Sequence, residues 1–532
     1  MKALEFVVIL GIALLVSGVL AHRFPIAPPI LQLAAGVLLG FVPWLRGTEL
    51  PPDILLLVFL PVLLYWESLT TSLRAIRRDL RGIVLSGTAL VAVSAWAVAA
   101  VAHGLGLPWG PAWVLGAAVA PTDATAVGVV ARLLPSRNVT ILRAESLIND
   151  GTALVVYSLA VAVTAGSEQL GALHTGGRLL LSYGGGIAAG VVVALAGIRL
   201  RGRLRPLDDA LLSNLAILLL PFTAYLLAEA VGASGVLAVV ICGLIMSQAG
   251  PRVGWADARL QTEAFWSLAI YLLNGFLFVL VGLEAQAAVH ALSSADLAGA
   301  LIIVAAVTLT LAVARLTFLT AFAYLIRILD RRPQQRRRRM SHRARAVSSL
   351  AGFRGAVSLA LALSVPYTVD DGSPFPDRDT IVFVTAGVVV TTLVVQGLVL
   401  PGVARWAHLP HATDEERELR LARTTATEAA LAAMSDVAAD LGTDPGVADR
   451  LRAEYETHLK TLRASDTAAE ESEPLLRRHR DDVDLRLALL AHKRAAVIEL
   501  RDARRIDDDV LLQLQAHLDI EEVRLAHRGP PR

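Results

Sequence analysis

Residues 117–131 read AAVAPTDATAVGVVA and residues 144–163 read AESLINDGTALVVYSLAVAV, so two neighbouring apolar stretches both contain acidic residues. Pro121, Thr122 and Asp123 interrupt the first stretch near its middle, and Glu145 and Asp150 lie near the start of the second. Acids inside a membrane are energetically costly and usually serve an ion pathway or pair with a base. We therefore expect the rest of the chain to hold these carboxylates in a bilayer and to expose them alternately to its two sides.

The composition is typical of a polytopic membrane protein. Of the 532 residues, 55% are hydrophobic, and the net charge of +2 is too small to favour a nucleic-acid partner. Apolar runs of about 18 or more residues are typical of membrane helices. We predict an all-α polytopic membrane protein with about 13 transmembrane helices, at residues 4–21, 25–42, 53–72, 82–102, 110–131, 145–166, 178–199, 210–230, 234–248, 263–288, 297–326, 346–366 and 379–404.

The distribution of arginine predicts the topology. Arginines gather in alternate loops, most densely at residues 327–345, whereas the intervening loops hold few cations. Because positive residues favour the cytoplasmic side, we expect the N-terminus outside the membrane and the C-terminus in the cytoplasm. Residues 336–339 would anchor the cytoplasmic face and contact anionic lipids. The first span also resembles a signal peptide, which would not change the remaining loops.

The chain divides into two parts by composition. We expect a transmembrane domain at residues 1–408 and a cytoplasmic helical tail at residues 409–532. Residues 414–441 and 475–525 have helical periodicity with many charge pairs, and residues 465–473 read as an acidic linker. The tail contains no metal, nucleotide or catalytic motif, so a structural or regulatory role is expected. The lone Cys242 excludes an internal disulfide.

Two of the spans are predicted to be broken helices. Pro121 removes a backbone donor from the fifth span, and Gly352, Arg354 and Gly355 lie near the start of the twelfth. Broken helices at membrane depth are tolerated where they face protein or a watery cavity, and transporters use their ends to bind ions. The two spans run in opposite directions, which predicts inverted repeats in which the broken helices cross.

The sixth span carries its polar residues at helical spacing. Glu145 and Asn149 are four residues apart, as are Ser146 and Asp150, so both pairs lie on adjoining faces of one turn. We expect Arg354 to be the base that pairs with Glu145.

The predicted ion site combines these residues with the broken fifth span. Asp150 and Asp123 would share a cation with the hydroxyl groups of Thr122 and Ser146 and with backbone carbonyls. Glu67, an intramembrane acid in the third span, could join through a water molecule.

These residues predict a mechanism of competition. Burial disfavours a charged carboxylate, and a second acid nearby disfavours it further. The site therefore takes up either a proton or a monovalent cation, and a carrier that crosses only when loaded exchanges one for the other. A cation channel would need a continuous polar path or a carbonyl filter, and an intramembrane aspartyl protease would need a Gly-x-Gly-Asp motif, which the sequence lacks. We expect a transporter and not an enzyme, with no cofactor.

The combined motifs resemble the bacterial sodium/proton antiporters of the monovalent cation–proton antiporter superfamily, and most closely its electroneutral sodium/hydrogen-exchanger branch. The resemblance covers nearly all of residues 1–405. It implies a homodimer in which a six-helix core slides against a dimerisation domain, and exchange of Na⁺, with Li⁺ or K⁺ as alternatives, for H⁺. The motifs are APTDATAV (120–127), AESLINDGTALVVY (144–157), LLLPFTAYLLAEAVGASGVLAVVICGLIMS (218–247), FWSLAIYLLNGFLFVLVGLE (265–284), GFRGAVSLALALSVP (352–366) and TLVVQGLVLPGVARW (392–406).

The resemblance also implies roles for single residues. The family's Thr-Asp matches Thr122-Asp123, and its Asn-Asp pair matches Asn149-Asp150. The branch that moves net charge has Asp-Asp at that pair, so Asn149 implies one-for-one exchange. By the same resemblance, Asp150, Asp123, Thr122 and Ser146 bind the ion, and Glu145 and Arg354 form an ion pair that holds the crossed helices.

Overall fold

The computed structural model divides into two compact units, Met1–His411 and Ala412–Arg532. Each unit is described by itself. The residues described are 2–24, 26–42, 45, 55–71, 73–123, 136–166, 172–204, 209–253, 256–291, 294–329, 342–352, 354–369, 371–407, 413–464, 473–503, 505 and 508–526.

The described residues are almost entirely helical, and their one β-type pairing is an isolated bridge between Thr368 and Pro374. The predicted all-α membrane fold is therefore confirmed. Eight of the described helices are long and apolar enough to cross a membrane, and shorter apolar helices lie at Pro28–Leu39, Leu57–Thr70, Trp109–Val119 and Gly235–Ala249. The first unit consists of α1 (Lys2–Arg23), α2 (Pro28–Leu39), η1 (Leu55–Phe59), α5 (Leu60–Thr70), α6 (Leu73–Leu85), η2 (Ser86–Leu90), α7 (Val91–Gly104), α8 (Trp109–Val119), α10 (Ser136–Ala165), α11 (Ala172–Leu204), α12 (Ala210–Ala230), α13 (Gly235–Val253), α14 (Ala256–Ala291), α15 (Ser294–Leu329), α17 (His342–Leu350), α18 (Ala356–Leu363) and α19 (Arg378–Ala407).

One predicted boundary is wrong in a way that matters for the site. α10 begins at Ser136 and not at Glu145, so Arg137 and Arg143 lie in the helix instead of in a loop. Arginine is a good helix former, and Pro135 stands just before the first helical residue. As a result Asp150 lies about four turns, or about 20 Å, from the start of α10. A helix that began at Glu145 would place Asp150 only about a turn and a half from its start.

Two helices of the first unit are broken where the sequence predicts it. α8 ends at Val119, ahead of Pro121, and α17 and α18 are separated by a non-helical segment that contains Gly352 and Gly355. The breaks meet each other, since Arg354 Nε donates a hydrogen bond to the carbonyl oxygen of Val119 at 3.0 Å. Residues 124–135 and most of the predicted basic loop at residues 327–345 lie outside the described residues.

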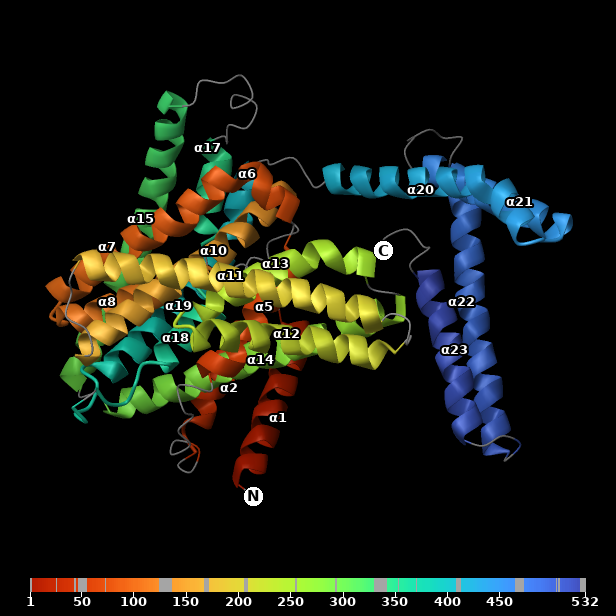
Figure 1. Ribbon diagram of the computed structural model, residues 1–532. Helices are drawn as coiled ribbons and strands as arrows, with labels where there is room; N and C mark the ends of the chain where they lie inside the picture. The colour runs from red at the N-terminus through yellow and green to blue at the C-terminus, as the bar shows by residue number, and fades with distance from the viewer. Residues whose placement is uncertain are drawn as a thin grey trace. The chain divides into compact units, whose positions relative to one another are not determined.

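The helices of the first unit pack in two groups (Figure 1). α8 packs against α7, α10, α18 and α19, and α15 packs against α7, α17 and α19. In the other group α13 packs against α5, α11 and α12, and α14 packs against α1, α2 and α12. α14 also contacts α18 and α19, which joins the groups.

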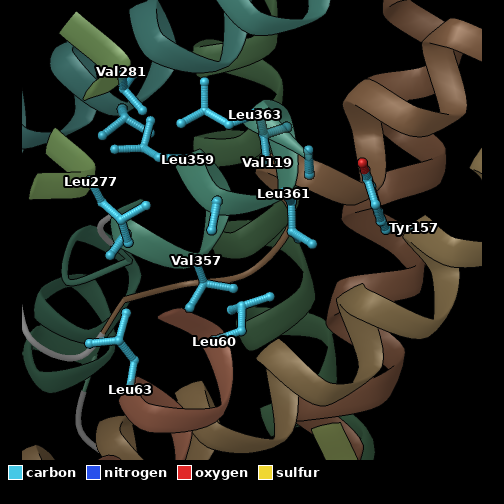
Figure 2. Close-up of a cluster of buried hydrophobic side chains, with 14 of the residues drawn as sticks. Leu60, Leu63, Val119, Tyr157, Leu277, Val281, Val357, Leu359, Leu361 and Leu363 are labelled. Atoms are coloured by element: carbon cyan, nitrogen blue, oxygen red, sulfur yellow. The ribbon is translucent and has the colours of Figure 1, made fainter. Parts of the chain in front are cut away.

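α18 lies at the centre of a continuous apolar core. Figure 2 shows its leucine and valine side chains facing α5, α14 and α10. α18 is short, but every one of its residues is buried, so the surrounding helices fix its position. The labelled residues are Leu60, Leu63, Val119, Tyr157, Leu277, Val281, Val357, Leu359, Leu361 and Leu363.

The second unit is a pair of helical hairpins. α20 (Thr413–Asp440) packs against α21 (Pro445–Ala464), and α22 (Glu473–Asp502) packs against α23 (Asp508–Ala526). Exposed ion pairs join the hairpin partners, including Arg463 with Glu428 at 2.7 Å and Lys493 with Glu521 at 3.2 Å. The predicted acidic linker at residues 465–473 lies outside the described residues except for Glu473, where α22 begins.

Candidate functional site

Hydrogen bonds join the break in α8 to α10. Ser146 Oγ donates to the carbonyl oxygen of Thr122 at 2.7 Å, and the side chains of Thr122 and Asn149 meet at 2.9 Å. The Asn149 amide is best satisfied with its oxygen toward Thr122, because its nitrogen then donates to the carbonyl oxygens of Glu145 at 3.1 Å and Gly87 at 3.2 Å. Gly87 belongs to the π-helix η2, a type of distortion frequent at functional sites. Asn149 therefore connects three backbone segments.

Asp150 is the most isolated acid of the site. Its residue surface is 2% exposed, and its Oδ1 atom is buried without a hydrogen-bond partner. Buried polar atoms in proteins are nearly always hydrogen-bonded, and an unpartnered charge is costly. The Asp150 carboxylate is therefore suited to a ligand that offsets its charge, and a proton and a small cation are the two candidates.

Glu67 brings a second carboxylate close to Asp150. It lies in α5, its Oε1 atom is buried without a hydrogen-bond partner, and its carboxylate is within hydrogen-bonding reach of the Ser146 hydroxyl. Glu67, Asp123 and Asp150 lie close enough to interact electrostatically. Negative charges so close together repel one another, and uptake of a proton or a cation relieves that repulsion.

Asp123 holds the second broken helix. The backbone N–H of Ala356 donates to Asp123 Oδ2 at 3.0 Å, at the first residue of α18. A carboxylate at a helix N-terminus also interacts favourably with the helix dipole. Gly355 makes this approach possible, since a Cβ atom there would lie 1.7 Å from Asp123 Oδ2. The contact assigns Asp123 a structural function at the helix crossing, and its predicted role as a direct ion ligand stays a prediction.

The predicted pairing of Glu145 with Arg354 is wrong. Glu145 Oε1 lies 2.9 Å from Nη2 of Arg315 in α15, and both side chains are buried, at 6% and 3% exposed. Arg354 instead donates to the carbonyl oxygens of Val119 at 3.0 Å and Gly352 at 2.5 Å, so its guanidinium satisfies the broken backbone. Arg315 also donates through Nε to the Ser348 carbonyl at 3.2 Å.

The sequence contained a signal for Arg315. It lies inside the apolar run of the eleventh predicted span, and the rule that singles out intramembrane acids applies equally to an intramembrane arginine. The ion pair with Glu145 and the bond to Ser348 make Arg315 a link between α10 and α17.

The donor set around Asp150 is composed of oxygen atoms. Carboxylates, hydroxyl groups and the carbonyls of an unwound helix are the groups with which transporters coordinate sodium. Among the described residues no three His, Cys, Asp or Glu side chains converge closely enough to hold a resident metal ion. Asp150 Oδ1 and Glu67 Oε1 are both buried carboxylate oxygens without a hydrogen-bond partner, so both are candidates to approach a bound cation.

Buried residues of α10 and α18 meet beyond Asp150. Tyr157 lies two turns beyond Asp150 on the same face of α10, about 10 Å along the helix. Its hydroxyl oxygen accepts a hydrogen bond from Ser364 Oγ at 3.2 Å, at the end of α18. Figure 2 shows Tyr157 across from Leu361, and both are buried.

Known proteins resemble this chain over most or nearly all of its length. The model of the transmembrane sodium/hydrogen exchanger family matches residues 10–406. A protein of Mycobacterium tuberculosis described as an uncharacterized Na⁺/H⁺ exchanger is 43% identical over 98% of this chain and 96% of its own length. An Escherichia coli protein with the same description is 30% identical over 98% of each chain. The structure of the sodium proton antiporter MjNhaP1 from Methanocaldococcus jannaschii superimposes with a TM-score of 0.57 and 22% identity, over 75% of this chain and 100% of that one.

Proposed function

The chain belongs to the sodium/hydrogen exchanger family, and from this membership we propose that it exchanges sodium ions for protons across the membrane. Family membership identifies it as a transporter, and relatives at 43% and 30% identity carry the name of sodium/proton exchangers. A potassium/proton antiporter is not favoured by these relatives, and a channel is disfavoured because the matching family consists of exchangers.

The unpartnered carboxylate oxygen of Asp150 is the observation that carries the mechanism. We infer that this carboxylate accepts a proton or a sodium ion, and that each excludes the other. Thr122, Ser146 and Glu67 complete the coordination, with Glu67 acting through water. The hydroxyl of Ser146 is well suited to this role, because it can turn between the Thr122 carbonyl and the Glu67 carboxylate.

Asn149 supports one-for-one exchange. Its amide nitrogen has two carbonyl acceptors, those of Glu145 and Gly87. An aspartate at this position would present lone pairs to those carbonyls and would introduce another titratable group. With Asn149 in place, Asp150 is the residue of this pair that gains and loses a proton, so one proton is exchanged for each sodium ion and no net charge moves.

The remaining organisation follows from the family and from the packing. We infer alternating access, in which the group that contains α8, α10 and α18 moves against the group that contains α11, α12 and α13. We also propose a homodimer in a bacterial plasma membrane, with residues 1–408 as the antiporter domain. Residues 409–532 would form a cytoplasmic regulatory tail, and the charged surfaces of its hairpins support a location in water.

Asp150→Asn tests the proposal. In everted vesicles that hold a preformed pH gradient, wild-type protein should dissipate the gradient when sodium is added, and Asp150→Asn should not. Asp371→Asn is a matched control, because it makes the same substitution at an exposed acid in a loop. Equal amounts of folded protein in the vesicles are verified by size-exclusion chromatography after extraction. Sodium-dependent dissipation by Asp150→Asn would contradict the assignment, and flux that does not saturate would indicate a channel.

A further inference from the structure

Arg345 of α17 is a buried cation, and among the residues that the structure describes no carboxylate forms an ion pair with it. Its residue surface is 5% exposed, and its Nε and Nη2 atoms are buried without hydrogen-bond partners. An uncompensated buried charge costs several kcal/mol. A side chain that remains in this position therefore requires an anion from elsewhere.

The helices around Arg345 supply no such anion. The sequence contains no acid between Asp330 and Asp370. α17 packs against α15 and α19, whose acids, Asp296 and Asp379, lie at the opposite ends of those helices. Glu145, whose partner Arg315 also contacts α17, is already paired with that arginine. Within the described part of the chain Arg345 therefore has no carboxylate to pair with.

Aromatic residues place Arg345 at the depth of lipid headgroups. The Arg345 guanidinium lies 5.7 Å from the ring centre of Tyr324 in α15, and the neighbouring Arg343 guanidinium lies 5.4 Å from that of Trp406 in α19. Tyr324 and Trp406 are 47% and 54% exposed. Tyrosine and tryptophan concentrate at membrane interfaces, where the phosphates of lipids are the most abundant anions. Arg331, Arg332 and residues 336–339 add further positive charge to the same segment of the sequence.

We propose that Arg345 binds a phosphate group, supplied by an anionic phospholipid at the end of α17, with Arg343 as a second and more exposed ligand. A guanidinium matches phosphate oxygens in a bidentate geometry, and such charge-assisted bonds are among the strongest available to a protein. The bound phosphate replaces the missing counterion and lets Tyr324 cover the other part of the Arg345 side chain.

The site is connected to the ion-binding residues. Arg315 donates to the Ser348 carbonyl, one turn after Arg345 in α17, and it also forms the ion pair with Glu145. α17 leads directly to the broken segment at Gly352. Phosphate binding therefore stabilises one position of α17 and raises the rate of exchange, an effect that depends on the sodium/proton exchange proposed above.

Lipid binding and transport are measured separately. The proposal of a phosphate site at Arg345 can then be tested even if the proposal of sodium/proton exchange fails. Full-length protein is reconstituted in phosphatidylethanolamine vesicles with increasing phosphatidylglycerol, and bound phosphatidylglycerol is counted by native mass spectrometry. Wild-type protein should retain phosphatidylglycerol and exchange faster as its fraction rises. Arg345→Gln should need about fivefold more phosphatidylglycerol for half-maximal binding and rate, the equivalent of about 1 kcal/mol, which is the usual contribution of one basic residue to binding of anionic lipid.

Matched variants distinguish this site from general surface charge. Arg405→Gln removes an exposed arginine at the same end of α19 and should leave the phosphatidylglycerol dependence unchanged, whereas Arg345→Lys should keep part of it. If Arg345→Gln does not fold, the Arg345→Lys titration and the wild-type lipid count still provide the test. Restoration of the rate by inorganic phosphate in neutral vesicles, lost in Arg345→Lys, would identify a soluble phosphate as the source.

Two results would overturn the proposal. Wild-type and Arg345→Gln proteins that bind the same amount of phosphatidylglycerol and show the same lipid dependence would exclude a phosphate site at Arg345. Absence of bound lipid in the wild type, together with equal destabilisation by Asp330→Asn and Arg345→Gln in a thermal unfolding assay, would identify Asp330 as the counterion.

Discussion

Gly355→Ala is a small change that should disable the helix crossing. The new Cβ atom would lie 1.7 Å from Oδ2 and 2.4 Å from Cγ of Asp123. The carboxylate must therefore move away and lose the hydrogen bond that it accepts from the backbone N–H of Ala356 at 3.0 Å. A hydrogen bond to a charged group contributes about 1.5–3 kcal/mol.

Loss of this hydrogen bond should lower the rate of exchange. If exchange requires Asp123 at the N-terminus of α18, a cost of about 1.5–3 kcal/mol lowers the competent population by about ten- to a hundredfold. The assay is sodium-dependent dissipation of a pH gradient by reconstituted protein, at equal amounts of folded protein. Gly397→Ala in α19 is the control, since a Cβ atom there meets no atom within 4 Å and alanine favours a helix. Wild-type exchange by Gly355→Ala would refute the reasoning.

Two further predictions concern the ion pair and the stoichiometry. Glu145→Gln and Arg315→Gln should each destabilise the protein by about 3–5 kcal/mol, because each leaves a buried charge without its partner, and the double variant should lose clearly less than the sum. Thermal inactivation in detergent ranks the stabilities of the two single variants and the double variant. If the double variant loses as much stability as the two single variants together, the two residues are not coupled. Exchange in vesicles with an imposed potential should proceed at an unchanged rate, whereas transfer of one net charge would be worth about 2.3 kcal/mol per 100 mV and would give a steep voltage dependence, contrary to the role of Asn149.

The sequence predicted the helices best where polar residues mark their ends. α12 occupies the predicted residues 210–230, because Asp209 caps its start through hydrogen bonds to Leu211 and Leu212, and Gly232 follows its end with a positive φ. The start of α10 was missed because hydropathy detects only the apolar part of a helix. Arg137 and Arg143 extend α10 beyond that part without interrupting its backbone.

The site could be predicted as a set of residues and less well as a set of contacts. The free-energy cost of placing an acid inside a membrane is enough to single out Asp123, Asp150 and Glu67. It does not decide which of two distant arginines pairs with Glu145, because that choice depends on where α15 and the break between α17 and α18 lie relative to α10. The function of Gly355 is similarly hidden, since a close approach to Asp123 is a property of the crossing and not of either stretch of sequence.

Proton release on sodium binding tests the central claim most directly. Purified protein is titrated with sodium chloride in weakly buffered detergent solution, and the protons released are compared with the sodium bound. Competition at Asp150 predicts one proton released for each sodium ion bound by wild-type protein and none by Asp150→Asn. Sodium binding by the wild type without release of protons would contradict the account.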